Sequence, residues 1–219
     1  MNNSTFTYRL YGRIKGRSKK NINIDDYFNE IEKYKLKKTE FNKINILDIG
    51  TGYGETSIFF SKKYIEKKIV ACENYINGNL NLIKNIKENK LTNLNIYNGN
   101  VNELLDQNIP CGNIDIVNIS FPDPWPKCKH KKRRLINLEF LNKIHGYMSA
   151  NSKIYISTDS TDYLEQIYYT IYHISHKFYW ENRNSDSLRY DDYGMPHTKY
   201  YKKAIISGRK PTFLILKKI

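Results

Sequence analysis

The stretch FPDPWPKCKHKKRR, residues 121–134, places one acid between two prolines, with an aromatic ring two residues further on. Each proline fixes its own φ and restricts the residue before it, so Asp123 is expected to be held in one orientation. A rigid carboxylate beside Trp125 could hold a planar base, because the acid accepts base N–H groups while the ring stacks. The alternative interpretation is that Trp125 is a core aromatic in a turn.

A run of cations follows directly behind this acid. It comprises Lys127, Lys129, Lys131, Lys132, Arg133 and Arg134. We interpret it as a set of phosphate contacts for an RNA or DNA backbone, against the alternative of a solvated charged face. The whole chain has 36 Lys and Arg against 22 Asp and Glu, a net charge of +14, which favours anionic partners. A coding bias toward lysine would also raise the total charge, but it does not predict local clustering.

A second candidate site lies in ILDIGTGYGETS, residues 46–57, where a strand-like run meets Gly50, Gly52 and Gly54. Glycines allow a sharp turn and a close approach of the backbone to a ligand. A dinucleotide fingerprint would need a further glycine at position 55, where Glu55 is a poor neighbour for pyrophosphate. GxGxG preceded by Asp48 suits S-adenosylmethionine, which has no phosphate and carries ammonium and sulfonium charges. A plain tight turn is the alternative.

Two further strand ends carry polar side chains of the kind that binds an adenosine group. The run KIVACE ends at Glu73, whose carboxylate could accept both ribose hydroxyls. The run NIYNGNV presents Asn100 and Val101, where the amide could donate to and accept from an adenine edge. The alternative for Glu73 is an incidental surface glutamate.

Alternating strand-like and helix-like runs must position these residues. Strands are predicted at Ile44–Ile49, Lys68–Glu73, Asn93–Tyr97, Ile114–Phe121, Lys153–Thr158 and Thr212–Leu216. Helices are predicted at Asp26–Lys37, Glu55–Glu66, Tyr75–Asn89, Asn102–Gln107, Leu135–Met148 and Thr161–Ser175. This alternation indicates an α/β fold with a parallel, doubly wound sheet, in which ligands collect at the carboxyl ends of the strands. The stretch 181–201 has no clear period, and a long polar connection of this kind is often functional.

The predicted domain organisation is a basic, flexible N-terminal arm over residues 1–25 and a single domain over residues 26–219. The three cysteines form no CxxC pair, so neither a disulfide framework nor a thiolate zinc site is expected. No histidine has a recognisable catalytic partner, and we expect no metal. No run approaches the roughly 18 apolar residues of a membrane span, so we expect a cytoplasmic protein with no membrane partner.

Five segments together resemble the bacterial tRNA (guanine-N7-)-methyltransferase family over nearly the whole chain. They are RLYGRIKGR, ILDIGTGYGETS, FPDPWPKCKHKKRR, STD at 157–159 and TKYY at 198–201. The resemblance implies a Rossmann-like class I methyltransferase fold, with a mostly parallel seven-stranded sheet and helices on both faces. It also implies S-adenosylmethionine as methyl donor, tRNA as partner, and guanosine 46 of the tRNA variable loop as acceptor.

The resemblance assigns roles residue by residue. Its donor contacts fall on Asp48, Glu73, Asn100 and Asp123, with Asp123 also at the catalytic position. Its substrate contacts fall on Lys127, Asp159, Thr198, Lys199, Tyr200 and Tyr201. The stacking argument adds Trp125, and the basic run adds Arg133 and Arg134. The family usually has aspartate where this chain has Asn100, and glutamate where it has Tyr201.

The sequence also allows two other functions. The chain could methylate another anionic substrate, such as ribosomal RNA or DNA. It could also be a non-catalytic RNA-binding module that keeps the fold, in which case it should not bind the methyl donor.

Overall fold

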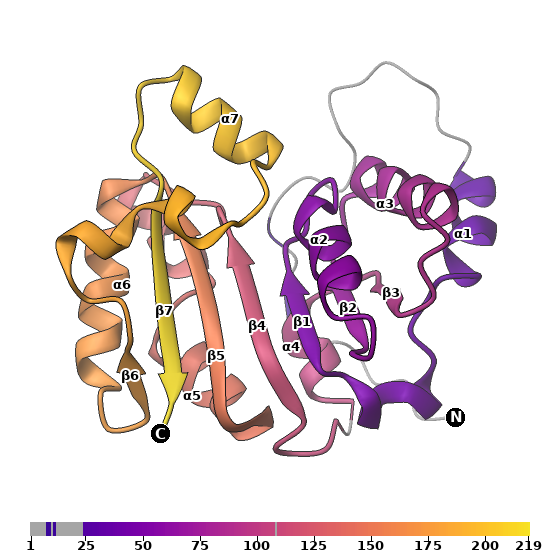
Figure 1. Cartoon of the computed structure of the whole chain (residues 1–219), viewed down its shortest axis with the longest axis horizontal. Coiled ribbons are helices and arrows are strands. Elements are labelled where there is room, and N and C mark those ends of the chain that lie inside the picture. The colour runs from indigo at the N-terminus through magenta and orange to yellow at the C-terminus, as the bar shows by residue number, and fades with distance from the viewer. Residues whose placement is uncertain (1–7, 10, 12–23, 108) are drawn as a thin grey trace.

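Among the described residues, seven strands form one sheet with helices on both faces (Figure 1). The structure is a computed structural model and describes residues 8, 9, 11, 24–107 and 109–219. The strands are β1 Ile46–Ile49, β2 Ile69–Cys72, β3 Leu94–Tyr97, β4 Ile114–Ser120, β5 Met148–Thr158, β6 Phe178–Trp180 and β7 Thr212–Lys218. Their order is β3-β2-β1-β4-β5-β7-β6, so the chain reverses its direction of travel across the sheet between β3 and β4.

The helices divide between the two faces and the upper edge of the sheet. They are α1 Ile24–Glu32, α2 Glu55–Lys63, α3 Ile76–Glu88, α4 Val101–Leu105, α5 Leu138–Tyr147, α6 Thr161–His173 and α7 Lys199–Ile206, with 3-10 turns η1 Lys38–Lys43, η2 Cys128–Arg133, η3 Ser185–Leu188 and η4 Tyr190–Tyr193. Side chains of α1, α2 and α3 pack on one face, and those of α4, α5 and α6 pack on the other. In Figure 1, α7 lies above the edge where the central strands end.

Both faces of the central strands are buried, which explains their continuous apolar runs. In β1, Ile46 packs into the core on the side of α2 and α3, whereas Leu47 packs into the core on the side of α4 and α5. Phe213 and Leu214 of β7 divide between the same two cores. Successive strand residues point to opposite faces, so each core receives every second side chain.

The predicted α/β alternation is confirmed, as is the mostly parallel seven-stranded sheet that the family resemblance implies. The strand pattern alone indicated a parallel sheet, from which one edge departs. Strands β1 to β5 pair in parallel, whereas β7 runs antiparallel to both β5 and β6. Strand β6 and helix α7 were not predicted. Strand β6 has only three residues, too few to show a period.

The first helix ends earlier than its sequence pattern predicts. The backbone after α1 pairs with β3 instead, because Leu36 N–H donates to the Ile96 carbonyl at 2.9 Å and Ile96 N–H donates to the Tyr34 carbonyl at 2.8 Å. Within the helix, Tyr27 is buried against the core, whereas Phe28 is 49% exposed. The edge of the sheet therefore ends the helix.

The arm predicted over residues 1–25 lies largely outside the described residues. Tyr8, Arg9 and Tyr11 are described, and they lie against the domain. Lys143 Nζ donates to the Tyr8 hydroxyl at 3.0 Å, which fastens this segment to α5. In the part of the chain that the structure describes, no helix is both long and apolar enough to span a membrane.

Candidate active site

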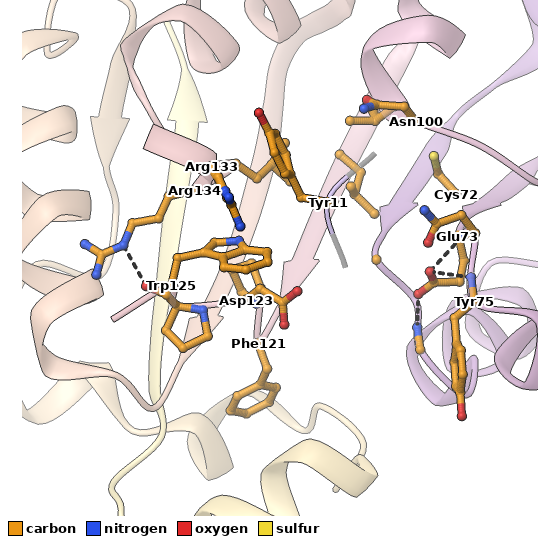
Figure 2. Close-up of a pocket in the computed structure, with 18 of the residues that line it drawn as sticks. Tyr11, Cys72, Glu73, Tyr75, Asn100, Phe121, Asp123, Trp125, Arg133 and Arg134 are labelled. Carbon is orange, nitrogen blue, oxygen red and sulfur yellow. Dashed lines mark hydrogen bonds between the residues drawn. The ribbon is translucent and has the colours of Figure 1, made fainter. Parts of the chain in front are cut away.

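A cavity of about 1040 Å³ lies at the carboxyl edge of the sheet. Its walls come from the ends of β1, β2, β3 and β4, together with residues of α7 and with Tyr8, Arg9 and Tyr11. Figure 2 shows Glu73 and Asp123 on facing walls, with Asn100 further along the wall of Glu73 and Trp125 beside Asp123. Parallel strands bring these distant sequence positions together, as the sequence predicted.

The glycine loop leaves β1 in a conformation that favours glycine. Gly50, Gly52 and Gly54 have φ values of +68°, +57° and +86°, and α2 begins at Glu55. Gly50 and Gly52 line the cavity, and a Cβ at Gly52 would lie 3.0 Å from the Tyr200 ring. Gly54 does not line it, because its position faces Leu82, whose Cδ1 would be 2.5 Å from an added Cβ. Gly54 therefore serves packing between α2 and α3.

Asp48 lies beneath this loop, is fully buried and does not line the cavity. Its carboxylate accepts hydrogen bonds from Thr56 Oγ1 at 2.6 Å, Ser57 Oγ at 2.5 Å and Asn118 Nδ2 at 2.7 Å. Burial raises the pKa of Asp48, and these three donors oppose that shift. The geometry makes Asp48 a support that joins β1, α2 and β4 below the glycine loop.

Glu73 holds the glycine loop and faces the cavity. One carboxylate oxygen accepts the Gly52 N–H at 2.8 Å, and the other accepts the Asn74 N–H at 2.8 Å and the Tyr75 N–H at 3.0 Å. Burial raises the pKa of Glu73, while the backbone donors act in the opposite direction. Each carboxylate oxygen can accept more than one hydrogen bond, so the group can still receive ribose hydroxyls.

Asn100 and Val101 lie at the end of β3 and line the cavity. The Asn100 side chain also begins α4, because its Oδ1 accepts the Asn102 N–H at 2.9 Å. An aspartate could cap the helix in the same way. The replacement of the family's usual acid by Asn100 therefore preserves the helix start and adds an N–H donor at the cavity wall.

The FPDPWP loop follows β4 and forms the facing wall. Phe121 and Trp125 have φ values of +50° and +42°, which are strained for residues with large side chains. Asp123 is exposed on the cavity wall between two prolines. Its predicted place at the cofactor edge agrees with the geometry, and its chemical role stays a prediction.

Arg133 packs over the ring of Trp125. Its guanidinium carbon lies 5.0 Å from the Trp125 ring centroid and 5.0 Å from that of Tyr11, within the range of cation–π attraction. Its Nε is buried and has no hydrogen-bond partner among the described residues. Arg133 therefore presents a cation and an unsatisfied donor next to the aromatic wall.

The residues of the basic run differ in exposure and in their partners. Lys127, Lys129 and Lys132 are exposed, as phosphate contacts would need to be, although only Lys132 of these three lines the cavity. Lys131 pairs with Asp162. The predicted phosphate contact at Arg134 does not fit the structure, because its side chain is 1% exposed and bonded to neighbouring protein groups.

Some of the remaining predicted substrate residues line the cavity, and the others stabilise nearby structure. Lys199 and Tyr200 line the cavity, whereas Thr198 caps α7 by accepting the Tyr201 N–H at 3.2 Å. Tyr201 is buried and its hydroxyl donates to Asp191 at 2.8 Å, away from the cavity wall. Asp159 also lies off this wall and accepts from Arg209 Nε at 2.7 Å.

Several tyrosines of the site were not predicted. Tyr53 and Tyr75 line the cavity with their hydroxyls 3.4 Å apart, and Lys199 Nζ lies 3.9 Å from the Tyr53 ring centroid. Both rings adjoin predicted site residues, so their positions next to the glycine loop and Glu73 could have revealed them. Tyr8 and Tyr11 carried no such signal. No group of three or more His, Cys, Asp or Glu among the described residues could hold a metal ion.

Known structures share the architecture of this chain. A 16S rRNA methyltransferase, KamB, superimposes with a TM-score of 0.57 at 13% identity, covering 89% of this chain and 93% of that one. An rRNA methylase from Streptococcus thermophilus gives a TM-score of 0.54 at 12% identity, covering 89% and 95%. With its strand order and glycine loop, the chain has the Rossmann-like fold of class I methyltransferases.

Sequence comparison narrows this class. The family described as "Putative methyltransferase" matches residues 42–214. The chain is 33% identical over 172 residues to the tRNA (guanine-N(7)-)-methyltransferase of Bartonella henselae, covering 77% of this chain and 72% of that one. It is 31% identical over 211 residues to the same-named protein of Wolbachia pipientis wMel, covering 92% and 90%. The chain belongs to the tRNA (guanine-N7-)-methyltransferase family.

Some relatives are longer than this chain. It is 31% identical over 220 residues to the bifunctional methyltransferase of Rickettsia conorii, and this match covers 96% of the chain but 40% of that protein. The match therefore accounts for one part of the bifunctional relative.

Replacing Glu73 by glutamine should weaken binding of S-adenosylmethionine about ten- to a hundredfold, the effect of removing a charge-assisted hydrogen bond. Wild-type affinity should also fall as the pH drops through the raised pKa of Glu73, above the value of about 4.3 for an ordinary glutamate. The charged form accepts from every donor, whereas the protonated form does not. Titration calorimetry across pH measures both effects, and unchanged affinity in the glutamine variant would remove Glu73 from the donor site.

Two glycines with positive φ allow a matched test of the loop. Gly52→Ala and Gly112→Ala should each lower stability by roughly 1–2 kcal/mol, because both positions are left-handed. Only Gly52→Ala should also reduce donor affinity, since its Cβ would meet Tyr200 at the cavity whereas Gly112 faces open space. Thermal unfolding and calorimetry on both variants check this. Normal donor binding by Gly52→Ala would contradict the assignment of the loop.

Proposed function

We propose that the chain transfers a methyl group from S-adenosylmethionine to N7 of guanosine in tRNA, with guanosine 46 of the variable loop as acceptor. The observation that carries this proposal is that one cavity has Glu73 on one wall and Asp123 with Trp125 on the other. The names of the relatives from Bartonella and Wolbachia support tRNA as the substrate class.

The residues of the Glu73 wall fit the methyl donor. The half-buried Glu73 carboxylate suits the ribose hydroxyls, the Gly50 and Gly52 backbone on the cavity wall suits a close approach of the donor, and Asn100 with Val101 suits the adenine edge. When bound, the donor supplies an electrophilic methyl group on a positively charged sulfonium. The acids Glu73 and Asp123 on the walls favour such a cation.

The facing wall suits a guanine base. Guanine N7 carries a lone pair and no proton in the neutral base, so its attack needs no general base. The task of the protein is then to position the base, which can lower a barrier by roughly 7–11 kcal/mol. Asp123 would accept the base N–H groups and stabilise the positive charge that develops on the ring, while Trp125 stacks on it.

Cations stand on both sides of this cavity. Lys127, Lys129 and Lys132 lie near the FPDPWP loop, and Lys202 and Lys203 lie on α7. All five are exposed. This arrangement suits a polyanion that crosses the mouth of the cavity, because a folded RNA can supply phosphates to the lysines on both sides.

The test is to incubate the purified chain with tRNA and S-adenosylmethionine and to analyse nucleosides by mass spectrometry. We expect 7-methylguanosine, which strand cleavage at the modified base should map to the variable loop. Methylation found only in ribosomal RNA or DNA would favour the other substrates considered above. Absence of donor binding would favour a non-catalytic RNA-binding module. We place the activity in the cytoplasm, where tRNA is available.

Replacing Asp123 by asparagine should slow methyl transfer about ten- to a hundredfold, because the variant keeps the size and removes the charge that favours the cationic base. Single-turnover transfer at saturating donor and tRNA is the measurement. Asp192→Asn is the control, since Asp192 is an exposed acid outside the cavity wall. A wild-type rate in Asp123→Asn would make Asp123 a turn residue only.

Replacing Lys127, Lys129 and Lys132 by glutamine should flatten the salt dependence of tRNA binding by about 0.7–0.9 log units for each phosphate that the variant no longer neutralises. The matched control replaces Lys37, Lys38 and Lys43, which are equally exposed and lie before β1 at the opposite edge of the sheet. Filter binding over a range of salt concentrations compares the two triple variants. Equal slopes would show that the run is only a solvated face.

A further inference from the structure

Arg133 and Arg134 are neighbours in sequence but face different surroundings. Arg133 packs over Trp125 at the cavity. The side chain of Arg134 is 1% exposed, and Figure 2 shows its guanidinium pointing away from the cavity, behind the FPDPWP loop. A buried arginine must be paired to offset its loss of solvation, so its partners indicate its role.

Those partners join the loop to α6. Arg134 Nε donates to the Pro124 carbonyl at 2.7 Å, and its NH1 group donates to Gln166 Oε1 at 2.9 Å and to the Asp162 carbonyl at 3.2 Å. The NH2 group pairs with the Asp162 carboxylate. The guanidinium carbon also lies 4.8 Å from the Tyr163 ring centroid. A lysine could not reproduce this set, because its ammonium lacks the planar fork that reaches several fixed acceptors.

The contact with Pro124 falls at the most constrained point of the loop. Pro124 lies between Asp123 and Trp125, and its carbonyl belongs to the peptide that precedes the left-handed φ of +42° at Trp125. A large residue in this region persists only when its surroundings hold it there. Arg134 supplies such a hold from the side opposite the cavity.

We propose that Arg134 is a positioning residue for methyl transfer, which holds Asp123 and Trp125 in place through the Pro124 carbonyl and does not contact RNA phosphate. This inference rests on the proposed function of the same cavity. It divides the basic run into exposed cations for the substrate and one buried cation for the loop. Asp162 completes the brace by anchoring Arg134 to the first turn of α6.

The experiment uses Arg134→Ala in a Trp180→Phe background. The chain has two tryptophans, so this background leaves Trp125 as the single fluorescent tryptophan. We expect single-turnover transfer to fall at least tenfold and acrylamide quenching of Trp125 to increase. Donor affinity and the salt slope of tRNA binding should stay at wild-type values. Ethylguanidinium should restore part of the rate by entering the vacated space, whereas ethylammonium should not, because it lacks the fork.

Arg133→Ala is the matched variant, and it should flatten the salt slope by about 0.7–0.9 if the Arg133 guanidinium neutralises one phosphate of the RNA backbone. The proposal is overturned if Arg134→Ala flattens the slope instead, or if it leaves both the transfer rate and Trp125 quenching unchanged. Should Arg134→Ala not fold, Asp162→Asn tests the same contact from its half-exposed partner. We expect slower methyl transfer and increased quenching of Trp125 in this variant. Wild-type values of both would contradict the role of the Arg134–Asp162 pair in holding the loop. If wild-type protein transfers no methyl group to tRNA, the proposed function fails, while quenching still decides whether Arg134 holds the loop.

Discussion

The hydrogen bond between the Gly52 N–H and the Glu73 carboxylate is the contact on which the rest of the site depends. Strands β1 and β2 pair in parallel with Ile49 opposite Cys72, so the chain leaves both strands side by side at the carboxyl edge. The Glu73 carboxylate holds the glycine loop, and α2 begins directly after this loop and packs on the sheet. The half-buried Glu73 thus holds the backbone of this wall of the cavity and places its own carboxylate there.

Acidic and basic side chains around the cavity differ in their surroundings. Glu73 lies on the cavity wall and is held by backbone donors, whereas Asp48 is buried beneath the glycine loop and is held by hydroxyl and amide donors. On the other side Lys127, Lys129 and Lys132 are exposed, where phosphates can reach them, whereas Arg134 is buried and paired with Asp162. Such an arrangement places the two signs of charge where each meets its complement, and the FPDPWP loop lies between them.

Local patterns were sufficient to predict which residues form one wall of the cavity, apart from Asp48 and Gly54. Gly50, Gly52 and Glu73 follow buried strands directly, and the parallel sheet brings such positions together whatever the details of packing. Residues whose role depends on distant contacts could not be assigned in this way. Arg134 looks like its exposed neighbours in sequence, and only its packing under Pro124 against α6 distinguishes it. Tyr201, at the position of the family's usual glutamate, likewise turns to Asp191, a partner that no spacing rule indicates.

We propose that one edge of the sheet binds the methyl donor through Glu73 and the acceptor base through Asp123 and Trp125. The decisive measurement is a crystal structure of the chain with S-adenosylhomocysteine and substrate tRNA. We expect ribose hydroxyls on the Glu73 carboxylate and a guanine stacked on Trp125, with N7 directed at the sulfur and Asp123 within hydrogen-bond distance of the base. A ribose bound away from Glu73, or a guanine bound outside the cavity, would contradict it.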